Sequence, residues 1–408
     1  MRAHRTRFDV VVAGAGPAGA AAAITLARLG LSVAAVDKAA FPRDKCCGDG
    51  LTTAALRLLE QLGLDPARVP SWEAVGDVVV VGSGGRQLEM QLPDDGTQFA
   101  ASARRTDLDA ALVDVARAAG VELREGQAVA GVAREGRTVR VDLAGGTSLS
   151  CDFLVAADGA WSPVRKALGG PAGYLGDWQA GRRYYAGCGP AAKKLWVWFE
   201  PDMVPGYAWS FPLAGGYVNV GYGIVRDSAG KVRGDLKGQQ VDLTERPHIA
   251  EVLGAGAEPV GQWKAWPIPA RIGSTELSAL GGRVLFAGDA ARACDPMTGE
   301  GIAQALETGR LAARAIAAAG PDHPEAAARR YHRQVRWGMA VDDALARALS
   351  RVLARPSGSD RALAIAGSSS WSRRNFARWM FEDYPRAVVA TPHRWVPKMF
   401  SRSGAYGA

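Results

Sequence analysis

The chain has 408 residues, of which 48% are hydrophobic and 22% charged, so it can bury a large core and is expected to form two or three structural parts. This composition excludes an intrinsically disordered, a collagen-like and a disulfide-rich protein. The formal net charge of +8 suggests an anionic partner, such as nucleotide phosphates, nucleic acid or a lipid surface.

Cysteines stand at positions 46, 47, 151, 188 and 294. Their odd number, and the adjacency of Cys46 and Cys47, favour a reducing cytoplasm over structural disulfides. No stretch approaches about 18 uninterrupted apolar residues, so we expect no membrane-spanning helix. The basic start imitates a signal peptide, but Asp9 and Pro17 interrupt the pattern.

The first part of the chain predicts one βαβ unit. A buried strand at 8–14 precedes a glycine turn and helix at 15–30, and a second strand follows at 31–37. The loop FPRDKCCGDGLT then leads to a helix at about 52–62, and strands lie within 78–91. A helix at 106–120 and strands to about 156 restore the alternation of helix and strand.

Strand patterns dominate the next part, 182–268. A buried strand at 283–290 and an Ala-rich helix at about 299–319 follow, and 340–408 is helical and then irregular. We therefore predict an α/β (α+β) fold in which a Rossmann-like nucleotide domain carries an inserted antiparallel-sheet domain and a C-terminal helical region. The predicted domains are 1–75, 101–181 and 270–340 for nucleotide binding, 76–100 and 182–269 for substrate binding, and 341–408 for the helical region.

The strongest motif is GxGxxG, formed by Gly14, Gly16 and Gly19 between the first strand and its helix. The first glycine permits the tight turn, the second lets a pyrophosphate approach, and the third lets helix and strand pack closely. Phosphates would sit on the helix N-terminus, where free amides favour negative charge. Asp37, after the next strand, would accept hydrogen bonds from the ribose hydroxyls.

Three later segments decide which nucleotide is bound. Arg105 opens a helix, Asp158 and Gly159 follow a buried strand, and Gly288 with Asp289 precede a second glycine-bearing helix start. Separately they could be a surface charge, a turn and a helix cap. Together, and in this order, they resemble the set found in FAD enzymes of the para-hydroxybenzoate hydroxylase and geranylgeranyl reductase superfamily.

This resemblance implies FAD as the cofactor, with Asp289 on the ribityl chain. The helix start at 299–302 would place amides near the flavin, where they stabilise the negative charge of its reduced form. The chain has no second GxGxxG, so the electron donor, NAD(P)H or another external reductant, would bind transiently. The expected flavin-binding residues are Gly14, Gly16, Pro17, Ala18, Gly19, Asp37, Lys38, Cys47, Gly48, Gly50, Arg105, Val129, Asp158, Gly159, Gly288, Asp289, Pro296, Gly299, Gly301 and Ile302.

The strand-rich part carries an aromatic wall. Tyr207, Trp209 and Phe211 would share one face of a strand, and Gly221 and Gly223 would clear space beside them. Five tryptophans, at 196, 198, 209, 263 and 266, fall within this part of the chain. The cluster indicates either a Trp-rich core or a large apolar ligand site.

The pattern Tyr-x-Trp-x-Phe-Pro, eight residues, then Gly-x-Gly resembles the substrate motif of the geranylgeranyl reductase family. The FPRDKCCGDGL loop resembles that family's loop, with Cys47 and Gly48 at its Cys-Gly pair and its form closest to menaquinone-tail reductases; Cys46 stands where relatives often have Pro. The family hydrogenates double bonds in isoprenoid chains of geranylgeranyl lipids, chlorophyll or menaquinone. The expected substrate residues are Tyr207, Trp209, Phe211, Pro212, Gly221, Gly223, Trp196 and Trp198.

An isolated alkene has no carbonyl to stabilise charge, so a proton must accompany the hydride, and aromatic faces would stabilise the resulting cationic character. Cys47, Tyr207 or a water could supply the proton, and we name Cys47, Tyr207 and Trp209 as catalytic candidates. Cys47 could instead only border the flavin. Cys46 and Cys47, with Cys294 expected near them, could also sense redox state; no metal site is expected.

Other readings stay open at this point. An aromatic hydroxylase would use the same FAD domain with oxygen, and a non-catalytic prenyl carrier like the GDP-dissociation inhibitors would share its ancestry. A flavin-dependent halogenase is disfavoured because no Lys occurs between 46 and 165. Nucleic-acid binding has only the net charge in its favour.

The tail, 370–408, is basic, and Trp371, Phe376, Trp379, Trp395 and Phe400 are interleaved with its charges. Such a tail would dock a cytoplasmic enzyme on the anionic inner face of the cell membrane, where prenyl lipids and prenyl quinones reside. The alternative is a tail packed onto the body by its aromatic residues.

Overall fold

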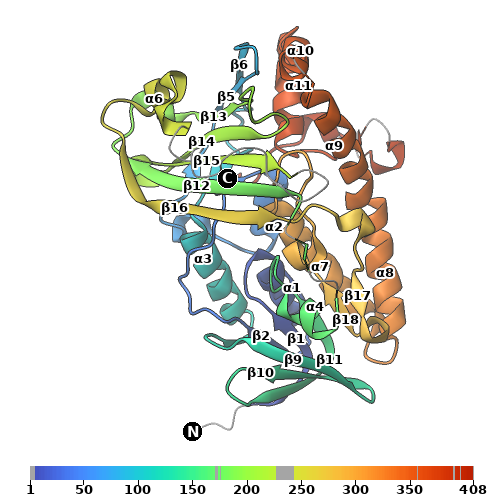
Figure 1. Ribbon diagram of the computed structural model, residues 1–408. Helices are drawn as coiled ribbons and strands as arrows, with labels where there is room; N and C mark the ends of the chain where they lie inside the picture. The colour runs from blue at the N-terminus through green and yellow to red at the C-terminus, as the bar shows by residue number, and fades with distance from the viewer. Residues whose placement is uncertain are drawn as a thin grey trace.

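The computed structural model describes residues 5–170, 173–174, 176–226, 243–355, 357–388, 391–395 and 397–407. Two large sheets lie toward opposite ends of the molecule, and the helices of the C-terminal third run along one side of both (Figure 1). The predicted α/β class is confirmed. Among the described residues, no helix combines the length and apolar character needed to cross a bilayer.

The first sheet has the order β17-β18-β11-β1-β2-β8. Its central strands β1 (Arg7–Ala13), β2 (Val33–Val36) and β11 (Ser148–Ala156) are parallel, and so is β18 (Val284–Phe286) next to β11. They are apolar nearly throughout because both faces of a parallel sheet are covered. The edges are β17 (Ser278–Ala279) and β8 (Glu122–Arg124), and a hairpin of β9 (Val129–Glu135) and β10 (Thr138–Leu143) pairs with β11.

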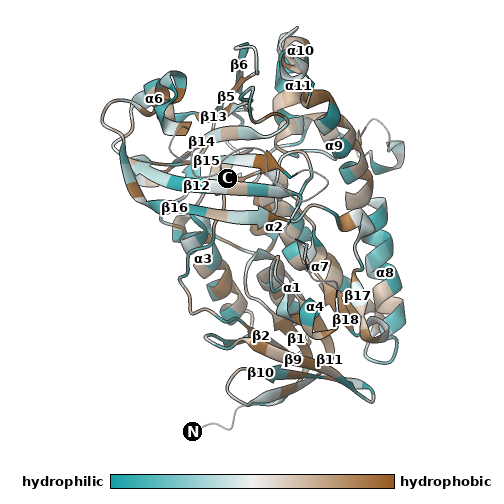
Figure 2. Ribbon diagram, in the orientation of Figure 1, coloured by the Kyte–Doolittle hydropathy of each residue, from teal (hydrophilic) through white to brown (hydrophobic). Residues whose placement is uncertain are grey.

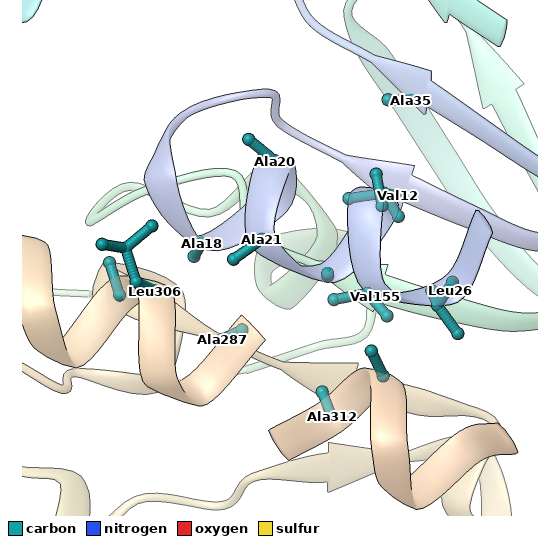
Figure 3. Close-up of a cluster of buried hydrophobic side chains, with 14 of the residues drawn as sticks. Val12, Ala18, Ala20, Ala21, Leu26, Ala35, Val155, Ala287, Leu306 and Ala312 are labelled. Atoms are coloured by element: carbon teal, nitrogen blue, oxygen red, sulfur yellow. The ribbon is translucent and has the colours of Figure 1, made fainter. Parts of the chain in front are cut away.

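Small side chains bring two helices close together over this sheet. α1 (Pro17–Arg28) packs along α7 (Ile302–Ala319), and Figure 3 shows Ala18 and Ala21 facing Leu306 and Ala312. At Gly309 a Cβ would lie 2.1 Å from the carbonyl oxygen of Ala18, so only glycine permits this approach. The remaining helices of this part are α2 (Thr53–Gln61), α3 (Arg105–Ala118), α4 (Pro163–Ala167) and α8 (Pro324–Trp337).

The second sheet has the order β16-β12-β15-β14-β13-β5-β6. Its strands are β16 (Glu258–Ile268), β12 (Trp178–Ala186), β15 (Tyr217–Val225), β14 (Tyr207–Leu213), β13 (Leu195–Trp198), β5 (Asp77–Val81) and β6 (Gln87–Gln91). We expected an antiparallel sheet, but β13 and β5 are parallel. A parallel pair needs a long crossover connection, and the whole nucleotide-binding segment between β6 and β12 supplies it here. β12 begins at Trp178, before the predicted boundary at 182.

Three short strands connect the two sheets, in the order β3 (Gly50–Leu51), β7 (Ala101–Ser102) and β4 (Glu73–Ala74). α6 (Pro247–Leu253) packs at the far end of the second sheet. The C-terminal helices are α9 (Met339–Leu353), α10 (Gly358–Ala366) and α11 (Ser370–Met380). In Figure 2, α11 carries both apolar and polar residues, and buried side chains of β5, β6, α10 and α11 form one apolar cluster.

Candidate functional site

A cavity of about 910 Å³ is lined by residues from most parts of the described fold. Its wall includes the glycine loop at the end of β1, the faces of β12, β14 and β16, the N-terminus of α7 and the C-terminal helices. Residues that the sequence assigned to a cofactor and to a substrate therefore line the same space.

The glycine loop is built as the motif predicts. Gly14 has a φ of 92°, and a Cβ there would lie 2.3 Å from the carbonyl oxygen of Ala157. A Cβ at Gly19 would lie 1.8 Å from the carbonyl oxygen of Gly14, so Gly19 packs helix against strand and does not line the cavity. Gly16 does line the cavity and leaves its surface free of a side chain.

Two guanidinium groups stand over Gly16. A Cβ there would lie 3.3 Å from Arg43 Nη2 and 3.7 Å from Arg105 Nη2. Both arginines share the buried carboxylate of Asp109, with N–O distances of 2.9 Å and 2.7 Å. Two cations and one anion leave net positive charge beside the loop, which suits the two phosphates of a dinucleotide. Sequence reasoning missed Arg43, although it lies in the loop that contains Cys47.

The predicted acidic residues also lie in the wall. Asp37 accepts hydrogen bonds from the backbone N–H groups of Ala15 (2.8 Å) and Ala39 (2.9 Å). Asp158 accepts from the Ser162 hydroxyl at 2.6 Å, and burial raises its pKa. Asp289 accepts from the Cys294 thiol at 3.5 Å. Lys38, Val129, Gly159 and Gly288 line the cavity beside them, and their flavin contacts stay a prediction.

The N-terminus of α7 differs from the prediction. Gly299, Gly301 and Ile302 line the cavity, but the amides of Ile302 and Ala303 already donate to Oε1 of Glu300, at 2.9 Å and 3.0 Å. Burial, and then the neighbouring carboxylate of Glu382, raise the pKa of Glu300 to about 8. Free amides were expected because the glycine spacing does not show that Glu300 folds back onto them. Pro296 is outside the wall, and its carbonyl accepts from Trp178 Nε1 at 3.2 Å.

These features fit a flavin dinucleotide. The loop lacks side chains where a pyrophosphate would approach, two arginines adjoin it, and the acidic side chains of Asp37, Asp158 and Asp289 line the same cavity as acceptors for hydroxyl groups. The fit rests on the loop, the arginines and the acidic residues, because the amides at α7 are shared with Glu300.

The aromatic wall forms as the strand alternation predicts. Tyr207, Trp209 and Phe211 of β14 line the cavity with successive ring centroids 5.8 Å and 5.9 Å apart. The Tyr207 hydroxyl donates to the carbonyl of Thr298, which ties the wall to the loop before α7. A Cβ at Gly221, paired with Trp209 on β15, would lie 2.3 Å from Trp209 Cζ2. The Trp209 indole therefore fills the space beside Gly221, and Gly221 does not widen the cavity.

Only some of the other predicted substrate residues line the cavity. Gly223 lines the cavity, whereas Pro212 and Gly221 do not. Trp196 and Trp198 are corrected: they lie on the opposite face of β13, stacked with centroids 5.5 Å apart, near His248 of α6. Because side chains alternate along a strand, Leu195, Val197 and Phe199 take the cavity side instead.

The CCGDG loop lies against the aromatic wall. A Cβ at Gly48 would be 3.5 Å from the Trp209 ring, and one at Gly50 would be 3.1 Å from the Phe211 ring. Cys47 and its neighbours line the cavity, and burial raises the pKa of the Cys47 thiol to about 12. Cys46 donates its S–H to the Lys264 carbonyl at 3.2 Å. All five cysteines are free thiols.

A buried polar pair joins this loop to the sheet, and sequence reasoning missed it. Asn219 of β15 accepts from Trp209 Nε1 at 3.0 Å and donates to the Cys47 carbonyl at 2.9 Å and to Asp49 Oδ2 at 2.8 Å. Tyr184 also donates to Asp49 Oδ2, at 2.7 Å. Asp49 is fully buried, and burial raises its pKa to about 6. These contacts join residues far apart in the chain, so no local pattern marks them.

Beyond the aromatic wall the cavity continues as an apolar channel between β5, β13 and the C-terminal helices. Leu349, Val352 and Leu353 of α9, Ala362 and Leu363 of α10, and Phe376, Trp379 and Met380 of α11 line it. The helices were predicted, but their part in the site was not, because an amphipathic pattern does not say what its apolar face covers.

The tail is largely packed onto the body. Arg378 pairs with Asp383, Arg386 with Asp295 at 2.8 Å and Arg394 with Asp342 at 2.8 Å. Phe376 and Trp379 line the channel rather than face solvent. The packed alternative therefore holds for these side chains, while Trp371, Trp395 and Phe400 are exposed and docking by the tail stays a prediction.

Known proteins resemble this chain over most of its length. The FAD binding domain family matches residues 7–178. A menaquinone reductase from Mycolicibacterium smegmatis is 35% identical over 346 residues, covering 77% of this chain and 78% of that protein. A digeranylgeranylglycerophospholipid reductase from Methanosarcina mazei is 29% identical over 323 residues, covering 76% and 75%.

A solved structure shares the fold. The geranylgeranyl bacteriochlorophyll reductase-like protein from Thermoplasma acidophilum aligns with a TM-score of 0.75 at 20% identity, covering 96% of this chain and all of that one.

Proposed function

The chain belongs to the geranylgeranyl reductase family of FAD-dependent oxidoreductases, and on that premise we propose that it hydrogenates double bonds in the prenyl tail of menaquinone or of a similar lipid. One observation carries the proposal: a single cavity joins the glycine loop and its arginines to an aromatic wall and then to an apolar channel. A linear hydrocarbon needs such a channel, whereas a small polar aromatic substrate does not.

The substrate class follows from the similarity to menaquinone reductases together with the channel. Leu195, Val197 and Leu363 would surround the chain with apolar surface, and Tyr207 and Trp209 would flank the reacting double bond. When bound, reduced FAD supplies the hydride. Trp209 and Phe211 would stabilise cationic character at the alkene carbon through their ring faces.

Cys47 is the proton donor that we propose. Its thiol is buried in the wall, and its raised pKa keeps it protonated at neutral pH. The Tyr207 hydroxyl is engaged with the Thr298 carbonyl, so we assign Tyr207 a positioning part. We further propose NAD(P)H as the electron donor, binding transiently, and a cytoplasmic location at the inner face of the membrane.

The test is anaerobic turnover of the purified yellow protein with a menaquinone whose tail is fully unsaturated. With NADPH as the reductant, we expect a product heavier by two hydrogens for each bond reduced, and in deuterium oxide at least one of the two new atoms should be deuterium. The variant Cys47→Ala should keep its flavin and lose this product. A colourless protein would favour a prenyl carrier, and oxygen consumption stimulated by a phenol would favour a hydroxylase; either result refutes the proposal.

A further inference from the structure

The apolar channel opens to the surface at the end of α9. Val352 lines the channel and is also 46% exposed. Cys47, Trp209 and residues of the glycine loop line the same cavity. A chain entering at Val352 would therefore reach the aromatic wall without leaving the cavity.

Two further exposed apolar side chains lie where α10 ends and α11 begins. Ile365 is 74% exposed and Trp371 is 72% exposed. They lie at the corner between α10 and α11, where the Ser368 hydroxyl donates to the Ile365 carbonyl at 2.8 Å and lies 3.3 Å from the Ser372 hydroxyl. At the other end of α10, a Cβ on Gly358 would lie 2.1 Å from the Val352 carbonyl oxygen. Val352, Ile365 and Trp371 thus border one helix.

The surroundings of these side chains are basic. Exposed arginines stand at 351, 355, 361, 373 and 374. Between residues 344 and 376 the sequence holds one acid, Asp360, and its carboxylate accepts from the backbone amides of Gly84 at 2.7 Å and Arg86 at 3.2 Å. We call these arginines with Val352, Ile365 and Trp371 the α10 face.

We propose that the α10 face docks this protein on an anionic bilayer, so that a membrane-dissolved prenyl chain enters the channel beside Val352. Apolar tips surrounded by arginines suit the boundary between acyl chains and anionic headgroups. This inference rests on the proposed function and locates its substrate entrance. It also narrows the membrane contact to the first residues of the tail and the helices before them, because Arg378, Arg386 and Arg394 farther along the tail are paired.

The test measures co-sedimentation of the FAD-loaded full chain with vesicles of phosphatidylcholine and phosphatidylglycerol, and of phosphatidylcholine alone. The double variant Ile365→Ser with Trp371→Ser should bind the mixed vesicles about tenfold more weakly. Trp337→Ser in α8, at a side chain 65% exposed, is the matched control and should bind like the wild type. Trp395→Ser, 57% exposed in the tail, should do the same.

Equal binding by the double variant, or equal binding of the wild type to both vesicle types, would overturn the proposal. A loss of vesicle binding confined to Trp395→Ser would also overturn it, because the contact would then lie near the end of the tail. Turnover separates this result from the proposed function: the double variant should reduce a detergent-dispersed prenyl quinone at the wild-type rate and a vesicle-embedded one more slowly. If no prenyl quinone is reduced in detergent, the proposed function fails whatever the vesicles show.

Discussion

Asp49 makes a prediction about pH that can be worked out from the structure. Its carboxylate is fully buried between the CCGDG loop and β15, and Tyr184 and Asn219 both donate to Oδ2. Among the described residues none hydrogen-bonds Oδ1. Burial outweighs these two hydrogen bonds and the nearby charges of Arg182 and Arg105, and raises the pKa from 3.8 to about 6. The perturbation is Asp49→Asn, because asparagine has a side chain of the same shape as aspartate and tolerates the backbone φ of 65° at this position.

A carboxyl group whose pKa is higher in the folded than in the unfolded state binds more protons when folded, so it lowers stability as pH rises through that interval. Between about pH 4.5 and about pH 7.5, a pKa shift from 3.8 to about 6 corresponds to a loss of about 2 kcal/mol in the free energy of unfolding. The asparagine variant lacks this loss. The difference in unfolding free energy, variant minus wild type, should therefore rise by about 2 kcal/mol over the same interval.

The assay is urea denaturation of both proteins at a series of pH values and one fixed FAD concentration. Groups that titrate equally in both proteins cancel when the wild-type free energy of unfolding is subtracted from that of the variant. Asp9→Asn is a control of opposite sign, because burial at Asp9 is outweighed by the hydrogen bonds from Ser32 together with the charges of Arg5 and Arg7, which lower its pKa. Its difference from the wild type should fall with rising pH. A pH-independent difference for Asp49→Asn would refute the reasoning, because a solvated carboxylate at this position would show no such dependence.

Four further substitutions test the site. Gly14→Ala should give colourless protein, since its Cβ would meet the Ala157 carbonyl at 2.3 Å; the flavin-to-protein absorbance ratio measures this. Gly221→Ala should push the Trp209 indole out of place, and Trp209→Ala should remove it, so both should keep FAD and lose most prenyl reduction, whereas flavin loss would mean that Trp209 is misassigned. Arg43→Gln should weaken FAD binding about tenfold by calorimetric titration, as expected for about 1.4 kcal/mol, and unchanged affinity would remove Arg43 from the site.

Much of the site was predictable because its signals are local. The turn at Gly14, the close packing at Gly19 and the shared face of Tyr207, Trp209 and Phe211 follow from the spacing of a few neighbouring residues. The α/β class followed in the same way from the alternation of periods along the chain. Such patterns depend on the geometry of a single turn or strand, and all the residues of that turn or strand are neighbours in the sequence.

The alternation of side chains along β13 does not show which face of the strand lines the cavity. It separates Trp196 and Trp198 from Leu195 and Val197, but it does not say which pair faces the cavity. The clustering of tryptophans in this part of the chain favoured them as a ligand wall. The packing of α6 against the other face decided otherwise, because the two indoles fill that smaller core.

The sequence by itself determined the cofactor loop, the aromatic wall and the family resemblance. Only the tertiary structure brought Asn219 to Asp49, folded Glu300 onto the amides of α7 and placed Val352 at the mouth of the channel. Each of these depends on contacts between segments that lie far apart in the chain or on the direction in which a side chain turns. Burial and hydrogen bonding at such contacts arise when the sheets and helices pack, so they have no counterpart in the local order of residues.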